Sequence, residues 1–299
     1  MNAFPWLTTL VVLPLVGSIV VALLPRSRPN LARVTALVVS VTTLVLTVAM
    51  ALTFDGSSTA PFQFTESYPW IPAFGVEYSV GLDGIGLVLV ALTAILVPIT
   101  VLAGWRDIEE NQEGEGSVKG YFALVLVLES IVIGVFSATD VFLFYVLFEV
   151  MLVPIYFMIG RYGGPQRAYA AVKFLLYSLL GGLFLLAALI GLYVVSAREN
   201  GQGTFDFLSL VALDIDPNTQ KLLFLGFFFA FAIKAPLWPF HTWLPDAAAQ
   251  SKPGTSVLLI GLLDKVGTFG MLRYCLPIFP AASEFYAPVV IGMAIVGIF

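Results

Sequence analysis

Long apolar runs recur along the whole chain and are separated by short polar segments. A helix of about 20 apolar residues, rising about 1.5 Å per residue, is long enough to cross about 30 Å of hydrocarbon. We therefore predict nine membrane-spanning helices, near residues 4–24, 31–53, 84–104, 120–138, 141–160, 170–197, 221–240, 254–274 and 285–299. The last run reaches Phe299 without a polar flank, so we expect the sequence to be the N-terminal portion of a longer protein.

Two longer polar segments interrupt this pattern. Residues 54–83 contain no Lys or Arg and are rich in aromatic side chains, and alternating pieces such as residues 62–64 permit a β-hairpin on the outer surface. The alternative is an irregular loop anchored by interfacial aromatic residues such as Trp70. Residues 105–119 form a polar linker, which we expect to be solvated.

The composition restricts the class of protein. Hydrophobic residues make up 59% of the chain and charged residues only 11%, which is too few to cover the surface of a soluble domain. Cys275 is the only cysteine and His241 the only histidine, so an internal disulfide, a Cys/His metal site and an iron–sulfur cluster all lack ligands. No glycine-rich loop between a strand and a helix is present to hold a nucleotide. We therefore expect neither a cofactor nor a metal in this chain.

The basic residues predict the orientation in the membrane, because cytoplasmic loops are enriched in Lys and Arg. Alternate loops, beginning after the first span, carry Arg26, Arg28, Arg33, Arg106, Lys119, Arg161, Arg167, Lys173 and Lys252. The opposite loops and helix ends carry Arg198, Lys221 and Arg273. This bias predicts that the N-terminus lies outside. The first apolar run lacks the preceding basic stretch of a signal peptide.

Three of the ionisable residues within predicted spans stand out, because each is far from the polar ends: Glu149, Lys234 and Lys265. A charged side chain in the hydrocarbon region is costly and rare, and it indicates function by default. Because the three residues include both signs of charge, they suggest a route for charge across the membrane.

Glu129 and Glu149 flank a tight turn around residues 137–140. Glu129 lies ten residues before Thr139 and Glu149 ten residues after it, so an antiparallel helical hairpin holds both carboxylates at a similar depth. If the two carboxylates face each other, they retain a proton between them. A protonated or hydrogen-bonded packing residue is the alternative role for either glutamate.

The seventh predicted span carries Lys234 just before Pro236 and Pro239. Because proline lacks a backbone N–H and clashes with the preceding turn, we expect the helix to break after Lys234. Transporters use such broken helices at ion sites. We expect the freed carbonyls to lie near the lysine as acceptors, and a change in its distance from Glu149 to load or unload its proton. A lysine that snorkels to an interface is the alternative.

The remaining candidates lie further along the chain. Lys265 follows Asp264, which points about 100° away on the helix and is better placed to pair with another helix. A structural ion pair is the alternative role for this lysine. His241 could relay protons, since its unperturbed pKa lies near neutrality, or it could lie at the interface. We interpret Asp246, where the chain leaves the membrane, as a capping or structural residue.

Three segments resemble the antiporter-like membrane subunits of respiratory complex I: FYVLFEVMLVPIYFMIGRYGG around Glu149, FAIKAPLWPFHTWLPDA around Lys234 and LLDKVGTFGMLRY around Lys265. The first of these, with the GGPQRAYAAVKFLLYSLLG that follows, is most similar to the M-type subunits of bacterial NADH-quinone oxidoreductase. VGLDGI and FSATDVFLFY fit the same family, so the resemblance covers nearly the whole chain.

The resemblance implies an all-α polytopic membrane fold of fourteen helices, built from two inverted five-helix repeats with the seventh helix broken. About nine of these helices would lie in this chain. Residues 1–119 would hold the first three with the outer loop 54–83, residues 120–278 the first repeat, and residues 279–299 the start of the second. The charged residue of the family's broken twelfth helix would lie beyond Phe299.

By position, Glu149 corresponds to the family's glutamate on helix five, Lys234 to its broken-helix lysine and Lys265 to its central lysine on helix eight. The resemblance implies a proton-translocating, non-redox subunit of NADH-quinone oxidoreductase (complex I) in the bacterial inner membrane. NADH, FMN, iron–sulfur clusters and quinone would belong to partner subunits. The expected partners are other membrane subunits of complex I and the lipid bilayer, with no nucleic acid. The family's histidine after Pro-Asp-Ala is missing from residues 248–254, so a relay there is not expected.

Other functions fit the same residues. A subunit of a multi-subunit cation/proton antiporter, or of a hydrogenase-type membrane complex, carries the same lysine and glutamate pattern. A structural scaffold, in which the buried charges only set the helix register, predicts that Glu149→Gln affects assembly but not pumping by each assembled complex.

Overall fold

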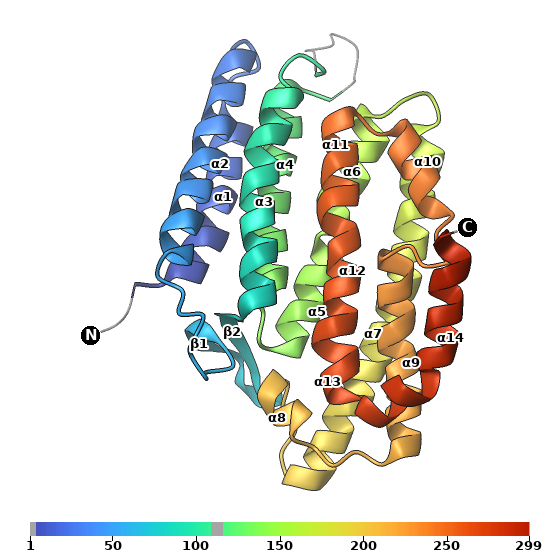
Figure 1. Ribbon diagram of the computed structural model, residues 1–299. Coiled ribbons are helices and arrows are strands. Elements are labelled where there is room, and N and C mark those ends of the chain that lie inside the picture. Colours follow the sequence, from blue (N-terminus) through green and yellow to red (C-terminus); the bar gives the residue numbers. More distant parts are fainter. Residues whose placement is uncertain (1–3, 109–115, 299) are drawn as a thin grey trace.

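The computed structural model describes residues 4–108 and 116–298 as a bundle of helices (Figure 1). The helices are α1 (Trp6–Leu23), α2 (Pro29–Ala51), α3 (Gly84–Ala103), α4 (Val118–Ser137), α5 (Val141–Val150), α6 (Leu152–Tyr162), α7 (Arg167–Asn200), α8 (Phe207–Val211), α9 (Pro217–Lys234), α10 (Trp243–Gln250), α11 (Pro253–Leu258), α12 (Asp264–Gly270), α13 (Leu276–Ile278) and α14 (Pro280–Ile298). Two strands, β1 (Gln63–Ile71) and β2 (Val76–Leu82), pair beside the bundle.

Within the described part of the chain, eight helical segments are long and apolar enough to cross a membrane. They match eight of the predicted spans; α5 with α6 forms one of them, and α11 to α13 form another. The remaining predicted span, the seventh at residues 221–240, is interrupted, because α9 ends at Lys234 and α10 begins only at Trp243. The predicted all-α polytopic fold is therefore confirmed, including the broken seventh span.

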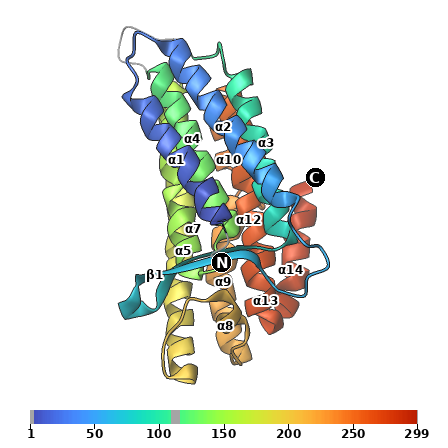
Figure 2. The same ribbon diagram turned by 90° about the vertical axis from the view of Figure 1, so that its left-hand side faces the viewer.

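The central helix of the bundle is α4. Inward-facing side chains occupy 83% of its span, and it packs against α1, α2 and α3 as well as α5 and α6. The 34-residue α7 is longer than its neighbours and packs against α6, α9 and α10 (Figures 1 and 2). The helix α12 packs against α9 and touches α4. Aromatic rings join α5 to α9, since Phe144 and Phe148 both lie about 6 Å from Phe231 between ring centroids.

The seventh and eighth spans are the least regular. Between α9 and α10 the chain forms turns over residues 235–242. In the following span, π-helical turns at Leu259–Leu263 and Met271–Cys275 stand on either side of α12. Such π turns insert an extra residue into the helical repeat and rotate the faces of the helix on each side, and they are frequent at functional sites. The first of them ends directly before Asp264.

Of the two alternatives for residues 54–83, the structure shows the hairpin. Strands β1 and β2 run antiparallel with Tyr68 opposite Tyr78, and Gly75 closes the turn with a left-handed φ of 64°, a conformation that favours glycine. The hairpin crosses in front of the helices beside the start of α1, and α7 and α8 extend below it (Figure 2). There the carboxylate of Glu66 accepts a 2.8 Å hydrogen bond from the backbone N–H of Leu7, so the hairpin caps α1.

The loops predicted to be basic meet at one end of the bundle. The connections α1–α2, α3–α4, α6–α7 and α10–α11 all lie at the upper end in Figure 1, opposite the hairpin. The fold therefore agrees with the alternation on which the predicted orientation rests. The predicted linker 105–119 lies at this end, but its residues 109–115 are outside the described part of the chain.

Candidate functional site

Lys234 is completely buried at the last residue of α9. Its ammonium nitrogen lies 4.7 Å from the ring centroid of Phe148 on α5 and 5.9 Å from that of Phe174 on α7. Across the described residues, this nitrogen has no hydrogen-bond partner. The negative faces of aromatic rings attract a cation without accepting its proton. The lysine is therefore held by contacts with aromatic rings and by no hydrogen bond to a described residue.

The helix break beside Lys234 has its own hydrogen bonds. Pro236 has no N–H to donate, and the backbone N–H of Leu237 instead reaches the carbonyl of Ala232 at 2.8 Å. The indole N–H of Trp243, the first residue of α10, donates to the carbonyl of Ile233 at 2.8 Å. The expectation that carbonyls freed by the prolines would accept from Lys234 is therefore wrong. Two of these carbonyls are already occupied, and the ammonium has no acceptor among the described residues.

Glu149 lies on α5, directly after the phenylalanine that contacts Lys234. One carboxylate oxygen, Oε1, is buried and has no hydrogen-bond partner among the described residues. The carboxyl group lies against Gly182 of α7, where an added Cβ would stand only 1.9 Å from Oε1. Glu149 interacts electrostatically with Lys234 but does not form a direct ion pair with it in the described structure. The two side chains thus interact through their charges without a direct ion pair.

Asp264 completes the charged cluster. It is the first residue of α12, and its oxygen Oδ1 is buried without a partner in the described part of the protein. Its charge interacts with Lys265 and with Lys234 across the α9–α12 contact. Asp264 therefore faces α9, the helix that carries Lys234. An interaction of Asp264 with another helix agrees with the sequence-based expectation.

Lys265 lies outside the buried cluster. Its side chain is exposed on α12 and lines a largely apolar groove of about 320 Å³ between α3 and α12. The groove also includes Ile85, Val88 and Leu272. The reason is geometric: neighbouring residues on a helix point about 100° apart, and Asp264 takes the inward direction. Lys265 therefore lies within a membrane-spanning segment, as the sequence predicts, but on the exposed face of that segment in the described structure.

Glu129 is also buried, on α4, and neither of its carboxylate oxygens has a hydrogen-bond partner among the described residues. Although Glu129 and Glu149 lie on consecutive helices, no hydrogen bond joins their carboxylates among the described residues. The proton that two facing carboxylates would share stays a prediction.

His241 lies in the break between α9 and α10 and is partly buried. Its Nδ1 atom is shielded from solvent and has no partner within the described residues. Nearby, Asp246 of α10 forms a 2.7 Å ion pair with Lys173 of α7, and the hydroxyls of Tyr177 and Thr242 lie 2.8 Å apart. These contacts hold α10 against α7, which agrees with the structural role predicted for Asp246.

Gly182 is the site residue that the sequence pattern does not reveal. The Gly181-Gly182 pair is typical of close helix packing, and nothing local indicates that one of the two faces a carboxylate. The role of Gly182 depends only on its lack of a side chain, which makes room for the carboxyl group of Glu149 on α5.

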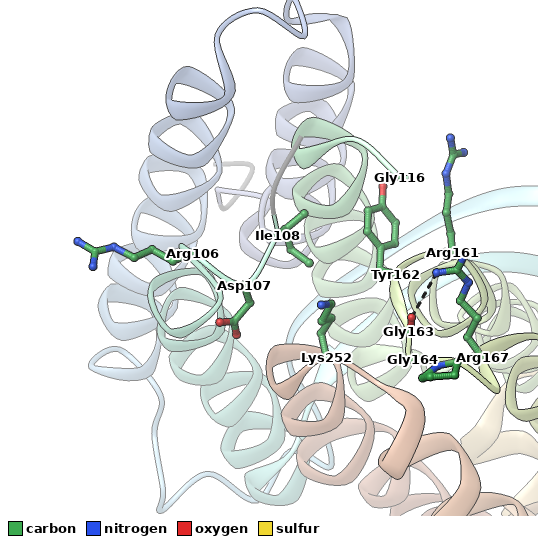
Figure 3. A pocket seen from close by; sticks show the side chains of 11 residues that line it. Arg106, Asp107, Ile108, Gly116, Arg161, Tyr162, Gly163, Gly164, Arg167 and Lys252 are labelled. Atoms are coloured by element: carbon green, nitrogen blue, oxygen red, sulfur yellow. Dashed lines mark hydrogen bonds between the residues drawn. The ribbon is translucent and has the colours of Figure 1, made fainter. Parts of the chain in front are cut away.

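A cavity away from these residues lies at the basic end of the bundle (Figure 3). It measures about 630 Å³ and is lined by Arg106, Asp107, Ile108, Gly116, Arg161, Tyr162, Gly163, Gly164, Pro165, Arg167 and Lys252. None of the predicted charge-carrying residues lines it. Over residues 4–108 and 116–298, no group of three or more His, Cys, Asp or Glu side chains is arranged to hold a metal.

Comparisons with known proteins place this arrangement in a family. Residues 138–299 match the family described as NADH:quinone oxidoreductase/Mrp antiporter, transmembrane. The chain is 49% identical to NADH-quinone oxidoreductase subunit M of Mycobacterium tuberculosis, in an alignment that covers the whole chain and 59% of the relative. It is 38% identical to NADH-ubiquinone oxidoreductase chain 4 of Chondrus crispus, over 95% of the chain and 56% of the relative. The chain thus spans a little over half the length of these relatives.

Solved structures give the same result. A chain of respiratory complex I from Thermus thermophilus with bound NADH superposes with a TM-score of 0.80 at 30% identity, covering 95% of this chain and 55% of that chain. A chain of the Mrp complex from Dietzia sp. has a TM-score of 0.76 at 21% identity, covering 93% of this chain and 29% of its own length, which shows a shared fold. The chain belongs to the NADH:quinone oxidoreductase/Mrp antiporter family of transmembrane proteins.

Proposed function

We propose that this chain is part of a proton-translocating membrane subunit of an NADH-quinone oxidoreductase. The observation that supports this most directly is Lys234, a fully buried cation at a helix break that has no hydrogen-bond acceptor among the described residues. A charge kept at such a site is costly, which favours a role in transport over a role in packing. The 49% identity to subunit M of M. tuberculosis favours the complex I context.

In this proposal the redox chemistry takes place in other subunits, which bind NADH, FMN, iron–sulfur clusters and quinone. A conformational change driven from those subunits alters the separation of Glu149 and Lys234. Opposite charges stabilise each other, so a change in their separation changes the affinity of the lysine for its proton. The proton is then released toward α12 and Lys265. Glu129 and His241, which are buried or partly buried but lie apart from this cluster, supply or accept protons at its ends.

The proposal extends to the rest of the route. The chain spans 59% of its M. tuberculosis relative, and Lys265 points out of the described bundle into the groove between α3 and α12. We propose that the route continues from Lys265 into the part of the subunit that corresponds to the remaining length of the relatives. Residues 120–278 would form the first repeat and residues 279–299 the start of the second. The basic end of the bundle would face the cytoplasm of a bacterial inner membrane, with the N-terminus outside.

Lys234→Ala tests the function in the full-length subunit within its assembled complex. We expect the number of protons pumped per NADH oxidised to fall to a small fraction of the unmodified value, because the buried proton carrier is lost. Lys221→Ala is the matched control, since this lysine lies on the same helix at its polar start. Proton pumping by Lys234→Ala at the level of the unmodified complex would contradict the proposal.

A multi-subunit cation/proton antiporter is the second candidate, because the family includes Mrp antiporters and the fold matches an Mrp complex. A hydrogenase-type membrane complex is a related alternative. Purification of the protein with its native partners separates them. Co-isolation of flavin and iron–sulfur subunits that oxidise NADH supports the complex I assignment. A complex that lacks these subunits and exchanges Na⁺ for protons supports the antiporter.

A further inference from the structure

We propose that Asp264 carries the proton between Lys234, inside the bundle, and Lys265, on the exposed face of α12. The inference rests on the proposed function and names a carrier that this function lacks. Lys234 and Lys265 lie on different helices and face different surroundings, one fully buried and the other exposed. Proton transfer from one lysine to the other therefore needs a titratable side chain that lies near both of them.

The direction of Asp264 follows from its position on α12. Gly267 lies three residues later, on the same face of the helix. A Cβ at Gly267 would stand 2.5 Å from the backbone nitrogen of Ala235 and 2.7 Å from the carbonyl oxygen of Phe231. This face of α12 therefore lies directly against the end of α9. Asp264 lies one turn away on that face, beside the residue at which α9 breaks.

The environment of Asp264 differs from that of a structural carboxylate. Buried carboxylates that stabilise a fold are normally hydrogen-bonded or paired, whereas Oδ1 of Asp264 is buried with no partner among the described residues. The acidic residues that serve structure here are bonded: Asp246 pairs with Lys173, and Asp140 accepts from the N–H of Leu143. Asp264 keeps an open acceptor at the contact between two helices.

Its electrostatic contacts also distinguish Asp264 from Glu149. Glu149 interacts with Lys234, whereas Asp264 interacts with both Lys234 and Lys265. Because successive side chains on a helix diverge by about 100°, Asp264 is half-buried, with Oδ1 shielded from solvent, while Lys265 is exposed. Asp264 is thus placed to pass a proton from the buried Lys234 to Lys265 in the exposed groove.

The transfer needs no further reactant. The Lys234 ammonium gives one proton to the Asp264 carboxylate, which leaves a neutral amine and a carboxylic acid. The acid then gives that proton to the neutral amine of Lys265, which restores the carboxylate and forms an ammonium. One proton has moved from the core to the outer face, and Lys234 is ready to accept another.

The test is Asp264→Asn in the full-length subunit within its native complex, reconstituted into vesicles. Asparagine keeps the size of the side chain but does not accept and release a proton at neutral pH. We expect Asp264→Asn to lower the number of protons pumped per NADH oxidised several-fold. The conservative variant Asp264→Glu should retain most of the pumping of the unmodified protein. Asp216→Asn is the matched control, because Asp216 is an exposed acidic cap at the start of α9.

The outcomes separate this inference from the proposed function. If Lys234→Ala abolishes pumping and Asp264→Asn does not change it, the route bypasses Asp264 and only this inference fails. Normal pumping by Lys234→Ala would overturn the function itself. Should the Asn variant fail to assemble, infrared difference spectra of the assembled Glu variant decide. A carrier shows a carboxyl band that appears during turnover and shifts relative to the unmodified protein, and identical spectra overturn the proposal.

Discussion

The contact between Glu149 and Gly182 shows how one missing side chain shapes the site. The carboxyl group occupies the space that a β-carbon on residue 182 would fill, at 1.9 Å from Oε1 and 2.4 Å from the carboxyl carbon. No real contact is that short, so any larger residue must displace the carboxylate or separate α5 from α7. The position of the Glu149 carboxylate relative to Lys234 thus depends on the lack of a β-carbon at residue 182.

Gly182→Ala is therefore expected to impair proton pumping although it alters no ionisable group. The added methyl group displaces the Glu149 carboxylate, and overpacking of this kind costs about 1–3 kcal/mol in stability. Protons pumped per NADH oxidised, measured per assembled complex, should fall several-fold. Gly292→Ala is the control, because nothing lies within 4 Å of a Cβ at that glycine of α14. Equal pumping by the two variants would show that the contact with Gly182 does not position the carboxylate.

The break between α9 and α10 is the element on which the site depends. Its prolines remove hydrogen bonds from the helix, and the tertiary structure replaces one of them with a side chain: the buried indole of Trp243 donates to Ile233, directly before Lys234. The broken segment is thus a defined structure with occupied carbonyls. The surface-facing ion pair of Lys173 and Asp246 adds less, because exposed pairs contribute about 0–1 kcal/mol.

Trp243→Phe tests this account of the break. The substitution keeps an aromatic ring in the core but leaves the Ile233 carbonyl without its donor, and a buried unsatisfied group costs about 1–3 kcal/mol. We expect a lower midpoint of thermal unfolding for the purified complex. Trp238→Phe, in the same break but 44% exposed, should leave the midpoint unchanged. The account fails if Trp243→Phe is as stable as the unmodified protein.

At the scale of the whole molecule, one ion pair joins parts that are far apart in the sequence. Arg273, in the π turn after α12, places its Nη2 atom 2.6 Å from Oδ1 of Asp83, which also caps α3 through the N–H of Gly86. The guanidinium contacts the rings of Phe62 before β1 and Phe207 of α8. The pair therefore ties α3, the hairpin region, α8 and the eighth span together at one end of the bundle.

Asp83→Ala should destabilise the fold more than any surface charge substitution. The side chain of Arg273 is 7% exposed and that of Asp83 is 29% exposed, so the cost of removing Asp83 lies below the roughly 3–5 kcal/mol of a fully buried pair, although the Arg273 charge is left uncompensated. The expected result is a marked loss of assembled complex and a lower unfolding midpoint. Asp55→Ala, in an exposed loop, is the control. A yield and midpoint equal to those of the control would contradict this role for the pair.

Sequence reasoning predicts the elements better than it predicts their mutual orientation. The spans, the hairpin and the break after Lys234 follow from apolar length, alternation and the two prolines, which are local properties. The orientation of the charges does not follow in this way. The hairpin of spans four and five places Glu129 and Glu149 at a similar depth, but depth does not set the rotation about each helix axis, and no hydrogen bond joins the two carboxylates. The π turn at Leu259–Leu263 changes which face of α12 points toward α9, and no local sequence pattern indicates this turn.

Local properties of the chain predict a polytopic helical bundle, basic loops that share one end and a lysine at a helix break. These properties are hydrophobicity, charge and proline, which act within a few residues. Tertiary packing, in contrast, sets Lys234 beside two aromatic rings, makes room for Glu149 at Gly182, and leaves Asp264 half-buried while Lys265 is exposed. Those outcomes depend on how helices distant in sequence rotate and pack, and close packing in the bundle selects one arrangement of all of them together.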